Sequence, residues 1–231
     1  MPTLNATKWG HIVSSNYASH AAARGASSGN SVSSNPSSGT VDAIRYRRFS
    51  AKGSTFYAIT RAFYYFDTSA ITGTVSSATL NIRSGDHVLG NDVIVVQSTA
   101  FSGDGSTDLV TADYNNVNFT STRSSNTTYD RGVNNAITLN ATALTEIQNN
   151  NAFIVAVLQY YNDQQDSALG SNTDLANEIN YATTGYLDYT VSGGGGTGPA
   201  NLTSLNGIAK ADITSINTIA IADISSINSV S

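Results

Sequence analysis

Phe153-Ile154-Val155-Ala156-Val157-Leu158 is a run of six apolar residues, and Val93-Ile94-Val95-Val96 is a shorter run of the same kind. Both runs are rich in β-branched residues and are flanked by polar residues, which is typical of strands. A strand that is apolar on successive positions is buried on both faces. The two runs therefore predict strands in the middle of a β-sandwich.

Weaker strand signals surround these two runs. The aromatic and β-branched segments lie at 41–49, 56–59, 62–66, 77–83 and 185–191, and the Ser- and Gly-rich segment 12–40 predicts short strands with a long polar loop. One helix is predicted over 140–149, where Leu144 and Ile147 are three residues apart and Asn140 or Thr142 can serve as N-cap. The sequence thus predicts an all-β fold, a jelly-roll-like β-sandwich with one short helix.

The composition limits the partners of this fold. The chain has 231 residues, a net charge of −5 and only 12% charged residues, whereas 40% of its residues are hydrophobic. It is too apolar for intrinsic disorder and too poor in charge for electrostatic binding of nucleic acid or anionic lipid. Because the sequence shows neither a secretory leader nor a long apolar stretch, we also expect no membrane insertion.

The residue types that usually carry catalysis show no characteristic spacing. The chain contains no cysteine. His11, His20 and His87 form no zinc-binding motif, and neither a nucleophile-elbow motif nor a Walker loop is present. We therefore expect that the protein is not an enzyme and needs no cofactor.

Two pairs of aspartates lie in polar loops after predicted strands. Asp104 and Asp108 form one pair, and Asp163 and Asp166 form the other. A glycosidase needs two carboxylates, but aspartates in such loops are ordinary turn residues. Oxygen-rich loops can hold a calcium ion, although the spacing here does not match an EF-hand. The four aspartates are therefore candidate ligands of a structural calcium ion, and the alternative is that the protein binds no metal.

The aromatic and basic side chains allow weak ligand predictions. Trp9, Tyr64, Tyr160 and Tyr161 are candidate platforms for stacking on a glycan, although core or interface packing also explains them. In each of the pairs Tyr64/Tyr65 and Tyr160/Tyr161, one ring can be buried while the other is exposed. The arginines at 45, 47 and 48 form the only basic cluster and predict a solvated strand face.

The end of the chain differs from the rest. We divide the protein into a sandwich domain (1–192), a Gly-rich linker (193–199) and a repetitive arm (200–231), whose period is eleven residues. An eleven-residue period fits a right-handed coiled coil, whereas the β-branched residues favour an extended arm. In both cases an aliphatic stripe without a core of its own predicts docking or oligomerisation, and the remaining alternative is a disordered tail, which does not require regularly spaced isoleucines. The stripe comprises Leu202, Leu205, Ile208, Ile213, Ile216, Ile219, Ile224 and Ile227.

A family resemblance extends over residues 11–191. Arg61-Ala-Phe-Tyr-Tyr-Phe-Asp67-Thr-Ser followed by Val75-Ser-Ser-Ala-Thr-Leu80 resembles the DNRLRE-type β-sandwich modules, which are similar to carbohydrate-binding modules. The likeness continues through the segments 109–115, 137–147 and 186–191. These motifs are mostly framework residues, so the resemblance implies a fold more than an activity.

The resemblance and the arm together suggest a function. Modules of this kind occur in phage particles and in secreted polysaccharide-degrading proteins, and the arm resembles repeats at the ends of phage structural proteins. We therefore expect a non-enzymatic virion protein, a head decoration, fibre or tail-associated component, whose arm contacts other virion proteins or its own copies and whose sandwich contacts a host glycan. The alternatives are a glycan-binding module of an extracellular or cell-surface protein and a subunit of a bacterial surface filament.

Overall fold

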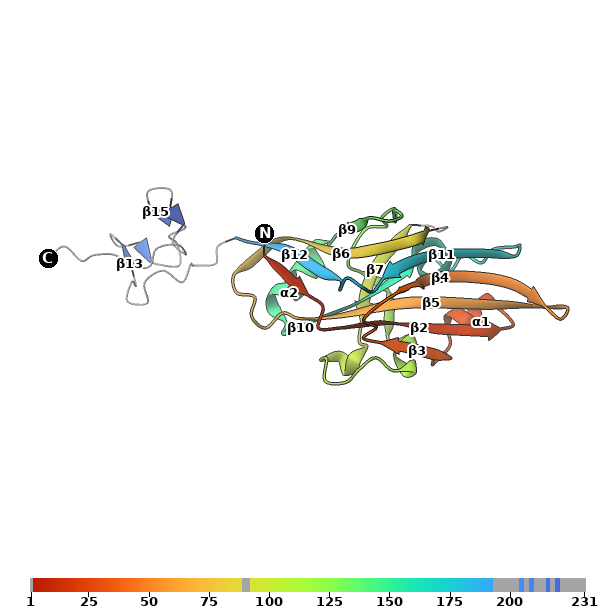
Figure 1. Ribbon diagram of the computed structural model, residues 1–231. Coiled ribbons are helices and arrows are strands. Elements are labelled where there is room, and N and C mark those ends of the chain that lie inside the picture. The colour runs from red at the N-terminus through yellow and green to blue at the C-terminus, as the bar shows by residue number, and fades with distance from the viewer. Residues whose placement is uncertain are drawn as a thin grey trace.

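The computed structural model describes residues 2–88 and 92–192, and the backbone of four two-residue strands in the arm (Figure 1). The linker predicted at 193–199 lies outside the described residues. The strands of the domain are β1 (Thr3–Asn5), β2 (Lys8–Tyr17), β3 (Ser31–Ser34), β4 (Thr40–Ala51), β5 (Ser54–Asp67), β6 (Thr74–Val88), β7 (Val93–Ser98), β8 (Val117–Thr122), β9 (Asn134–Thr138), β10 (Ala152–Gln159), β11 (Thr173–Asn180) and β12 (Tyr186–Ser192). The helical segments are α1 (His20–Arg24), α2 (Ala141–Asn149), the 3-10 turns η1 (Phe101–Gly103) and η2 (Thr111–Asn115), and the π-type turn η3 (Tyr160–Gln164). The predicted all-β, sandwich-like fold is confirmed.

The strands form two layers that are joined along one edge. The first layer has the order β1–β12–β6–β9. In the second layer β5 pairs with β2 on one side, and on the other side with β4 over its first half and with β10 over its second half. Strand β11 joins the layers because it pairs with both β4 and the end of β6. Figure 1 shows β11, β4, β5 and β2 side by side, with the β4–β5 turn at the end of the domain opposite the N-terminus.

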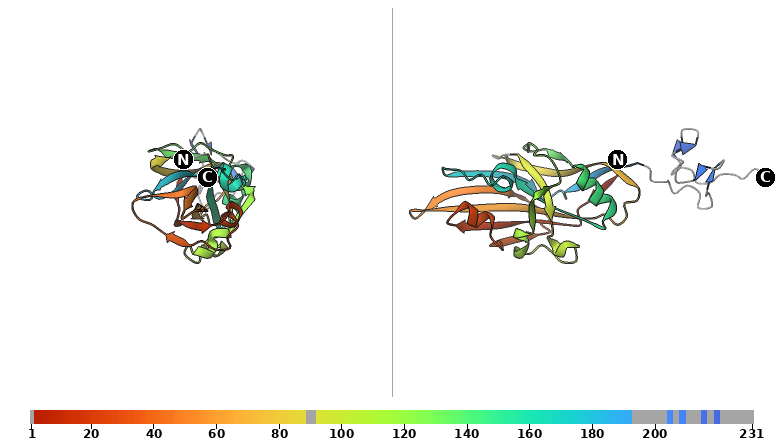
Figure 2. Two further views of the ribbon diagram at one scale, coloured as in Figure 1. Left: turned by 90° about the vertical axis from the view of Figure 1, so that its right-hand side faces the viewer. Right: turned by 180° about the vertical axis from the view of Figure 1, so that it is seen from behind.

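The apolar residues divide into two clusters on the two faces of the second layer. Val93, Val95, Phe153, Val155 and Val157 face the first layer. The residues between them lie in the other cluster, which α1, η1 and η2 cover from outside; they are Ile94, Val96, Ile154, Ala156 and Leu158. Strands β7 and β10 are therefore buried on both faces, as their continuous apolar runs predict. Figure 2 shows α2, in the view from behind, at the end of the sandwich near the N-terminus.

The structure differs from the sequence prediction in the extent of its elements. The predicted strands 56–59 and 62–66 are one continuous strand, β5, because Thr60 and Arg61 between them are buried within the sheet. Strands β8, β9 and β11 were not expected, since their polar residues give a weak periodic signal. The predicted helix is α2, with Asn140 as its N-cap, and α1 is a second short helix that begins after Ser19.

The described segments of the arm are strands that pair as two small hairpins. Ser204–Leu205 pairs with Ile208–Ala209, and Ser215–Ile216 pairs with Ile219–Ala220. The two hairpins have the same register and are eleven residues apart in the sequence. The described part of the arm is therefore extended. Among the described residues, no helix is both long enough and apolar enough to cross a membrane.

Candidate functional site

An open cleft of about 520 Å³ lies on the inner face of the second layer. Its lining includes His11 and Val13 from β2, Arg45, Arg47 and Phe49 from β4, and Thr60 from β5. Thr60 is on the same side of β5 as Ala62 and Tyr64, which the first layer covers. The cleft is therefore the part of this sheet face that the first layer leaves open.

The wall formed by β4 is charged, but its charges are paired. The Nε atom of Arg45 donates to Oδ1 of Asp174 over 2.7 Å, and its Nη1 atom lies 3.1 Å from Oδ2 of Asp42. The hydrogen bond that Arg45 donates to Asp174 raises the pKa of Arg45. The guanidinium carbon of Arg47 lies 4.5 Å from the centre of the Phe49 ring. Because guanidinium groups and rings of this kind can bind hydroxyl groups and sugar faces, the cleft is suited to a polar ligand.

His11 forms the opposite wall. Its ring stacks on Tyr181 with 5.7 Å between the ring centroids, and its Nδ1 atom lies 3.2 Å from the Tyr181 hydroxyl. Only 8% of His11 is exposed, and burial lowers its pKa to about 4. The imidazole is therefore neutral at pH 7, and the wall that it forms carries no charge.

Three potential metal ligands lie beside the cleft. They are Asp42 at the start of β4, His87 at the end of β6 and Glu178 on β11, and their ligand atoms all lie within 4.8 Å of one another. The Nδ1 atom of His87 lies 2.9 Å from Oδ1 of Asp42, and the His87 backbone N–H donates to Oε2 of Glu178 over 2.8 Å. Asp42 and Glu178 also line the cleft.

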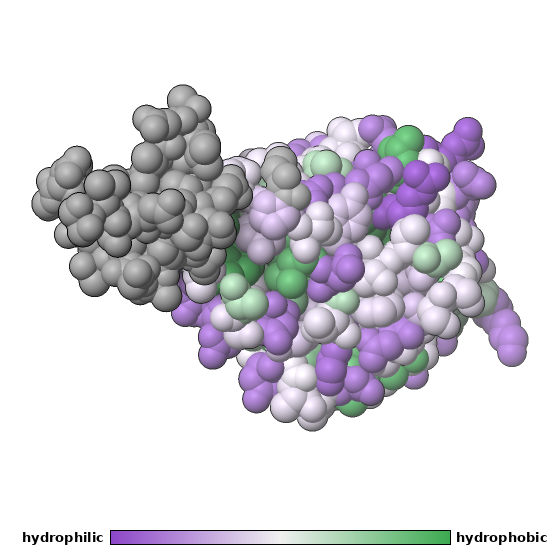
Figure 3. All heavy atoms as spheres, turned by 60° about the vertical axis from the view of Figure 1, so that its left-hand side comes forward, coloured by the Kyte–Doolittle hydropathy of each residue, from purple (hydrophilic) through white to green (hydrophobic). Residues whose placement is uncertain are grey.

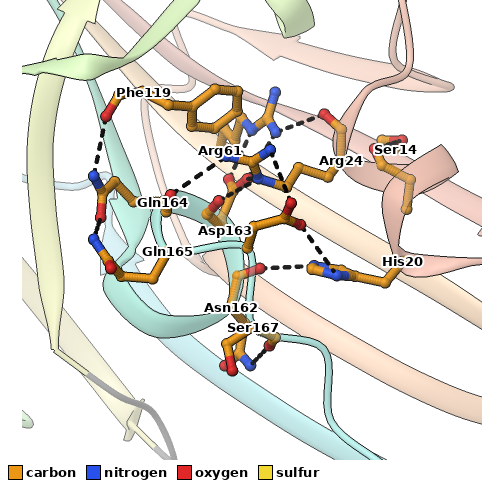
Figure 4. Close-up of polar contacts among 12 residues, drawn as sticks. Ser14, His20, Arg24, Arg61, Phe119, Asn162, Asp163, Gln164, Gln165 and Ser167 are labelled. Atoms are coloured by element: carbon orange, nitrogen blue, oxygen red, sulfur yellow. Dashed lines mark hydrogen bonds and ion pairs between the residues drawn. The ribbon is translucent and has the colours of Figure 1, made fainter.

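A buried cluster on the other side of the second layer centres on Arg61 and Asp163 (Figure 4). The Arg61 Nε and Nη2 atoms each donate to one oxygen of Asp163 over 2.7 Å. Nη1 donates to the Tyr114 carbonyl over 2.7 Å and Nη2 also to the Arg24 carbonyl over 2.9 Å. Burial acts to lower the pKa of Arg61, but the charge of Asp163, the neighbouring Tyr114 and the hydrogen bonds to Asp163 together outweigh burial and raise the pKa. The cluster joins β5, α1, η2 and η3, so its role is structural.

The four predicted aspartates lie in different surroundings, although Asp163 and Asp166 both lie within 4 Å of Arg24. Asp104 accepts from the Ser106 backbone N–H over 2.8 Å in an exposed turn, and Asp108 pairs with Lys8 over 3.3 Å. Asp166 is exposed and lies 3.7 Å from Arg24. Asp163 is not a hydrated loop residue, because both of its oxygens accept from Arg61. In residues 2–88 and 92–192 the one group of three or more His, Asp or Glu side chains that could hold an ion is Asp42, His87 and Glu178, and none of the four predicted aspartates belongs to it.

The predicted aromatic platforms lie in different environments. Tyr64 is 1% exposed and packs in the core, so it is unable to stack on a glycan. Trp9 is half-buried, and its Nε1 donates to the Pro36 carbonyl over 3.0 Å. Tyr160 is half-buried and Tyr161 is 47% exposed, and their rings meet edge to face with 4.8 Å between centroids. Of the four residues, Tyr161 offers the most exposed ring.

The predicted docking residues are only partly described. The backbones of Leu205, Ile208, Ile216 and Ile219 lie in the hairpin strands. Leu202, Ile213, Ile224 and Ile227 lie outside the described residues. In both described hairpins the aliphatic residues are directly opposite each other, since Leu205 pairs with Ile208 and Ile216 with Ile219.

Sequence reasoning did not find the cleft or the group beside it. The cleft and the group are lined by residues from five strands, β2, β4, β5, β6 and β11, and pairwise spacing in the sequence carries no signal for them. The strand predicted at 77–83 ended before Gly85, whereas β6 continues to Val88, and an isolated glycine inside a strand is a signal for a bulge.

Comparison with known proteins adds no functional assignment. No protein-family model matches the chain, and no curated protein matches it.

The surface of the domain agrees with its composition. Figure 3 shows weakly polar residues over much of the visible face, mixed with strongly hydrophilic and a few hydrophobic ones. Among the described residues, the large hydrophobic side chains that are exposed come from four different segments; they are Val32, Val110, Val133 and Tyr161.

Proposed function

We propose that the protein is a non-enzymatic structural component of a virion, such as a head decoration, fibre or tail-associated protein. In this proposal the sandwich is exposed to solvent and the arm attaches it to other virion proteins or to further copies of the chain. The observation that carries the proposal is the repetition of one hairpin at an interval of eleven residues.

The hairpins support a docking role because they are too small to be stable by themselves. Each described strand has two residues, whereas an isolated two-stranded hairpin of ordinary length is already marginal in water. Aliphatic residues at equivalent positions of both hairpins become buried when several arms, or an arm and another protein, assemble.

A variant series tests this role of the arm. In the full chain, Leu205, Ile208, Ile216 and Ile219 are changed to Ser, and a matched control carries Ser204→Ala and Ser215→Ala. Light scattering should give a smaller mass for the variant that lacks the four aliphatic residues, but not for the control. In a complementation assay, the same variant should fail to enter particles. Equal mass and equal incorporation of both variants contradict the docking role.

The virion assignment has a separate test. Cells are infected with the phage that carries the gene, and the particles are purified from the lysate. Mass spectrometry then identifies the proteins of these particles. We expect peptides of this protein in a constant ratio to those of the major particle protein, and their absence excludes a virion role.

The cleft favours glycan binding as a second function. Arg45 and Arg47 line the cleft, the guanidinium group of Arg47 lies beside the flat ring of Phe49, and the opposite wall with His11 is neutral. A glycan array with the full chain is the first screen. For a glycan that binds, Phe49→Ala should weaken binding if the cleft is the site, and Tyr161→Ala should weaken it if the exposed tyrosine pair is the site. If neither Phe49→Ala nor Tyr161→Ala changes the affinity, the glycan binds neither in the cleft nor at the tyrosine pair.

A further inference from the structure

We propose that Asp42, His87 and Glu178 form a binding site for a divalent transition-metal ion, with Zn²⁺ as the best match. The donor set is one imidazole nitrogen and two carboxylates. Imidazole favours zinc and related ions over calcium and magnesium, which prefer oxygen ligands alone. Three protein ligands leave one position of a tetrahedral ion for water or for an oxygen atom of a ligand.

Irregularities in two neighbouring strands bring the three side chains together. Asn177 and Ile179 of β11 pair with Ile44 and Val41 of β4, so two residues of β4 stand opposite Glu178. On the other side the same two residues pair with Val88 and Ser84 of β6, so three residues of β6 stand opposite Glu178. Bulges re-aim side chains and are frequent beside functional sites. Here both bulges are at the level of one glutamate, and each contributes one ligand residue.

The glycine in the β6 bulge makes room for the glutamate. A Cβ atom on Gly85 would lie 2.3 Å from Oε2 and 2.8 Å from Cβ of Glu178. Every other residue type at this position would therefore displace the Glu178 side chain. The same Oε2 atom accepts from the His87 backbone N–H over 2.8 Å, which orients the carboxylate.

The polar contacts of the group are compatible with an ion. Arg45 pairs with Oδ2 of Asp42 over 3.1 Å, whereas Oδ1 faces Nδ1 of His87 at 2.9 Å. A proton shared between Nδ1 and Oδ1 is replaced when an ion binds. Bonds of about 2 Å to a tetrahedral ion place the ligand atoms roughly 3.3 Å apart. Because the three ligand atoms lie within 4.8 Å of one another, side-chain rotations have to close the widest gap by up to about 1.5 Å. An ion bound here would lie at the border of the cleft, because Asp42 and Glu178 line it.

The experiment measures metal binding by the full chain. Protein treated with a chelator and then dialysed is titrated with Zn²⁺ by calorimetry, and Co²⁺ absorption reports the coordination. We expect one ion per chain and a tetrahedral Co²⁺ spectrum. His87→Ala and Glu178→Gln should each weaken Zn²⁺ binding by at least about tenfold. Asp104→Asn with Asp108→Asn, a change in an exposed loop, is the control and should bind like the wild type.

A fourth variant separates the site from nonspecific binding. Gly85→Ala keeps all three ligands but displaces Glu178, so it should also weaken Zn²⁺ binding by at least about tenfold. Circular dichroism shows whether each variant keeps the fold. The His87 side chain is 43% exposed, so its removal should leave the fold intact, and His87→Ala alone is sufficient for the conclusion. The proposal is wrong if the wild type binds no Zn²⁺ at 100-fold molar excess, or if folded His87→Ala binds it like the wild type.

Discussion

Arg61 and Asp163 are 102 residues apart in the sequence and form a bidentate ion pair in which their side chains are 0% and 1% exposed. The pair joins the middle of β5 to the turn η3, and the same guanidinium donates to the carbonyls of Arg24 and Tyr114. The Tyr114 ring lies against it, with 4.0 Å from the guanidinium carbon to the ring centroid. One charged residue thus holds four segments of the outer cluster together.

Removing one partner of this pair should be strongly destabilising. In Asp163→Asn the guanidinium remains buried without its counter-charge, and we expect a loss of about 3–5 kcal/mol in the free energy of unfolding. Urea denaturation measures this loss. The control is Asp166→Asn, whose side chain is 58% exposed and which should change stability by less than about 0.5 kcal/mol. Equal effects of the two variants contradict the structural role of the pair.

Stability should depend on pH through His11. The pKa of its imidazole is about 4 in the folded protein and 6.5 when exposed, so the unfolded chain binds more protons between these values. Stability therefore falls as the pH decreases from 6.5 to 4, by up to about 3 kcal/mol from this residue. Because carboxylates titrate in the same range, the informative quantity is the difference between wild type and His11→Gln in urea denaturation. A pH dependence that the variant does not reduce would argue against a buried neutral imidazole.

The core strands could be predicted from sequence because their signal is local. Residues 153–158 alternate between two clusters that are both apolar, and such a strand has no polar position to interrupt its pattern. The same reasoning divided β5 at Arg61, since a charged residue in a strand normally marks exposure. The ion pair with Asp163 lets Arg61 be buried inside β5, and the position of Asp163 depends on a turn that no local pattern predicts.

The candidate sites were less accessible to sequence reasoning for a related reason. Asp163 has the sequence context of a hydrated turn, and only the fold gives it a buried partner. His87 has no second ligand at helical spacing, because its neighbours come from β4 and β11 through two bulges. The arm is different, since its eleven-residue period is visible in the sequence and reappears as the spacing of the hairpins.

Tyr64 should tolerate the loss of its hydroxyl group. Within the described residues this buried oxygen has no hydrogen-bond partner, and burial raises the pKa of the phenol. Tyr64→Phe should therefore be neutral or more stable by up to about 1 kcal/mol. The matched control is Tyr114→Phe, which removes a buried hydroxyl that donates to the Ala23 carbonyl over 2.9 Å and should cost about 1 kcal/mol. Thermal unfolding compares the two, and a larger loss for Tyr64→Phe would show that the Tyr64 hydroxyl makes a stabilising hydrogen bond and would contradict the prediction.

Gly10 should be irreplaceable because β3 passes close to it. A Cβ atom at this position would lie 2.1 Å from the Ser33 carbonyl oxygen and 3.0 Å from a methyl group of Leu109. Since the first contact is with backbone, β3 has to move away from β2, and Gly10→Ala should cost about 1–3 kcal/mol in the free energy of unfolding. Gly170→Ala is the control because a Cβ atom there meets nothing within 4 Å. Without a clash, alanine restricts the unfolded chain and should be neutral or more stable by up to about 1 kcal/mol. If urea denaturation gave both variants the same stability, the close approach of β2 and β3 at Gly10 would be wrong.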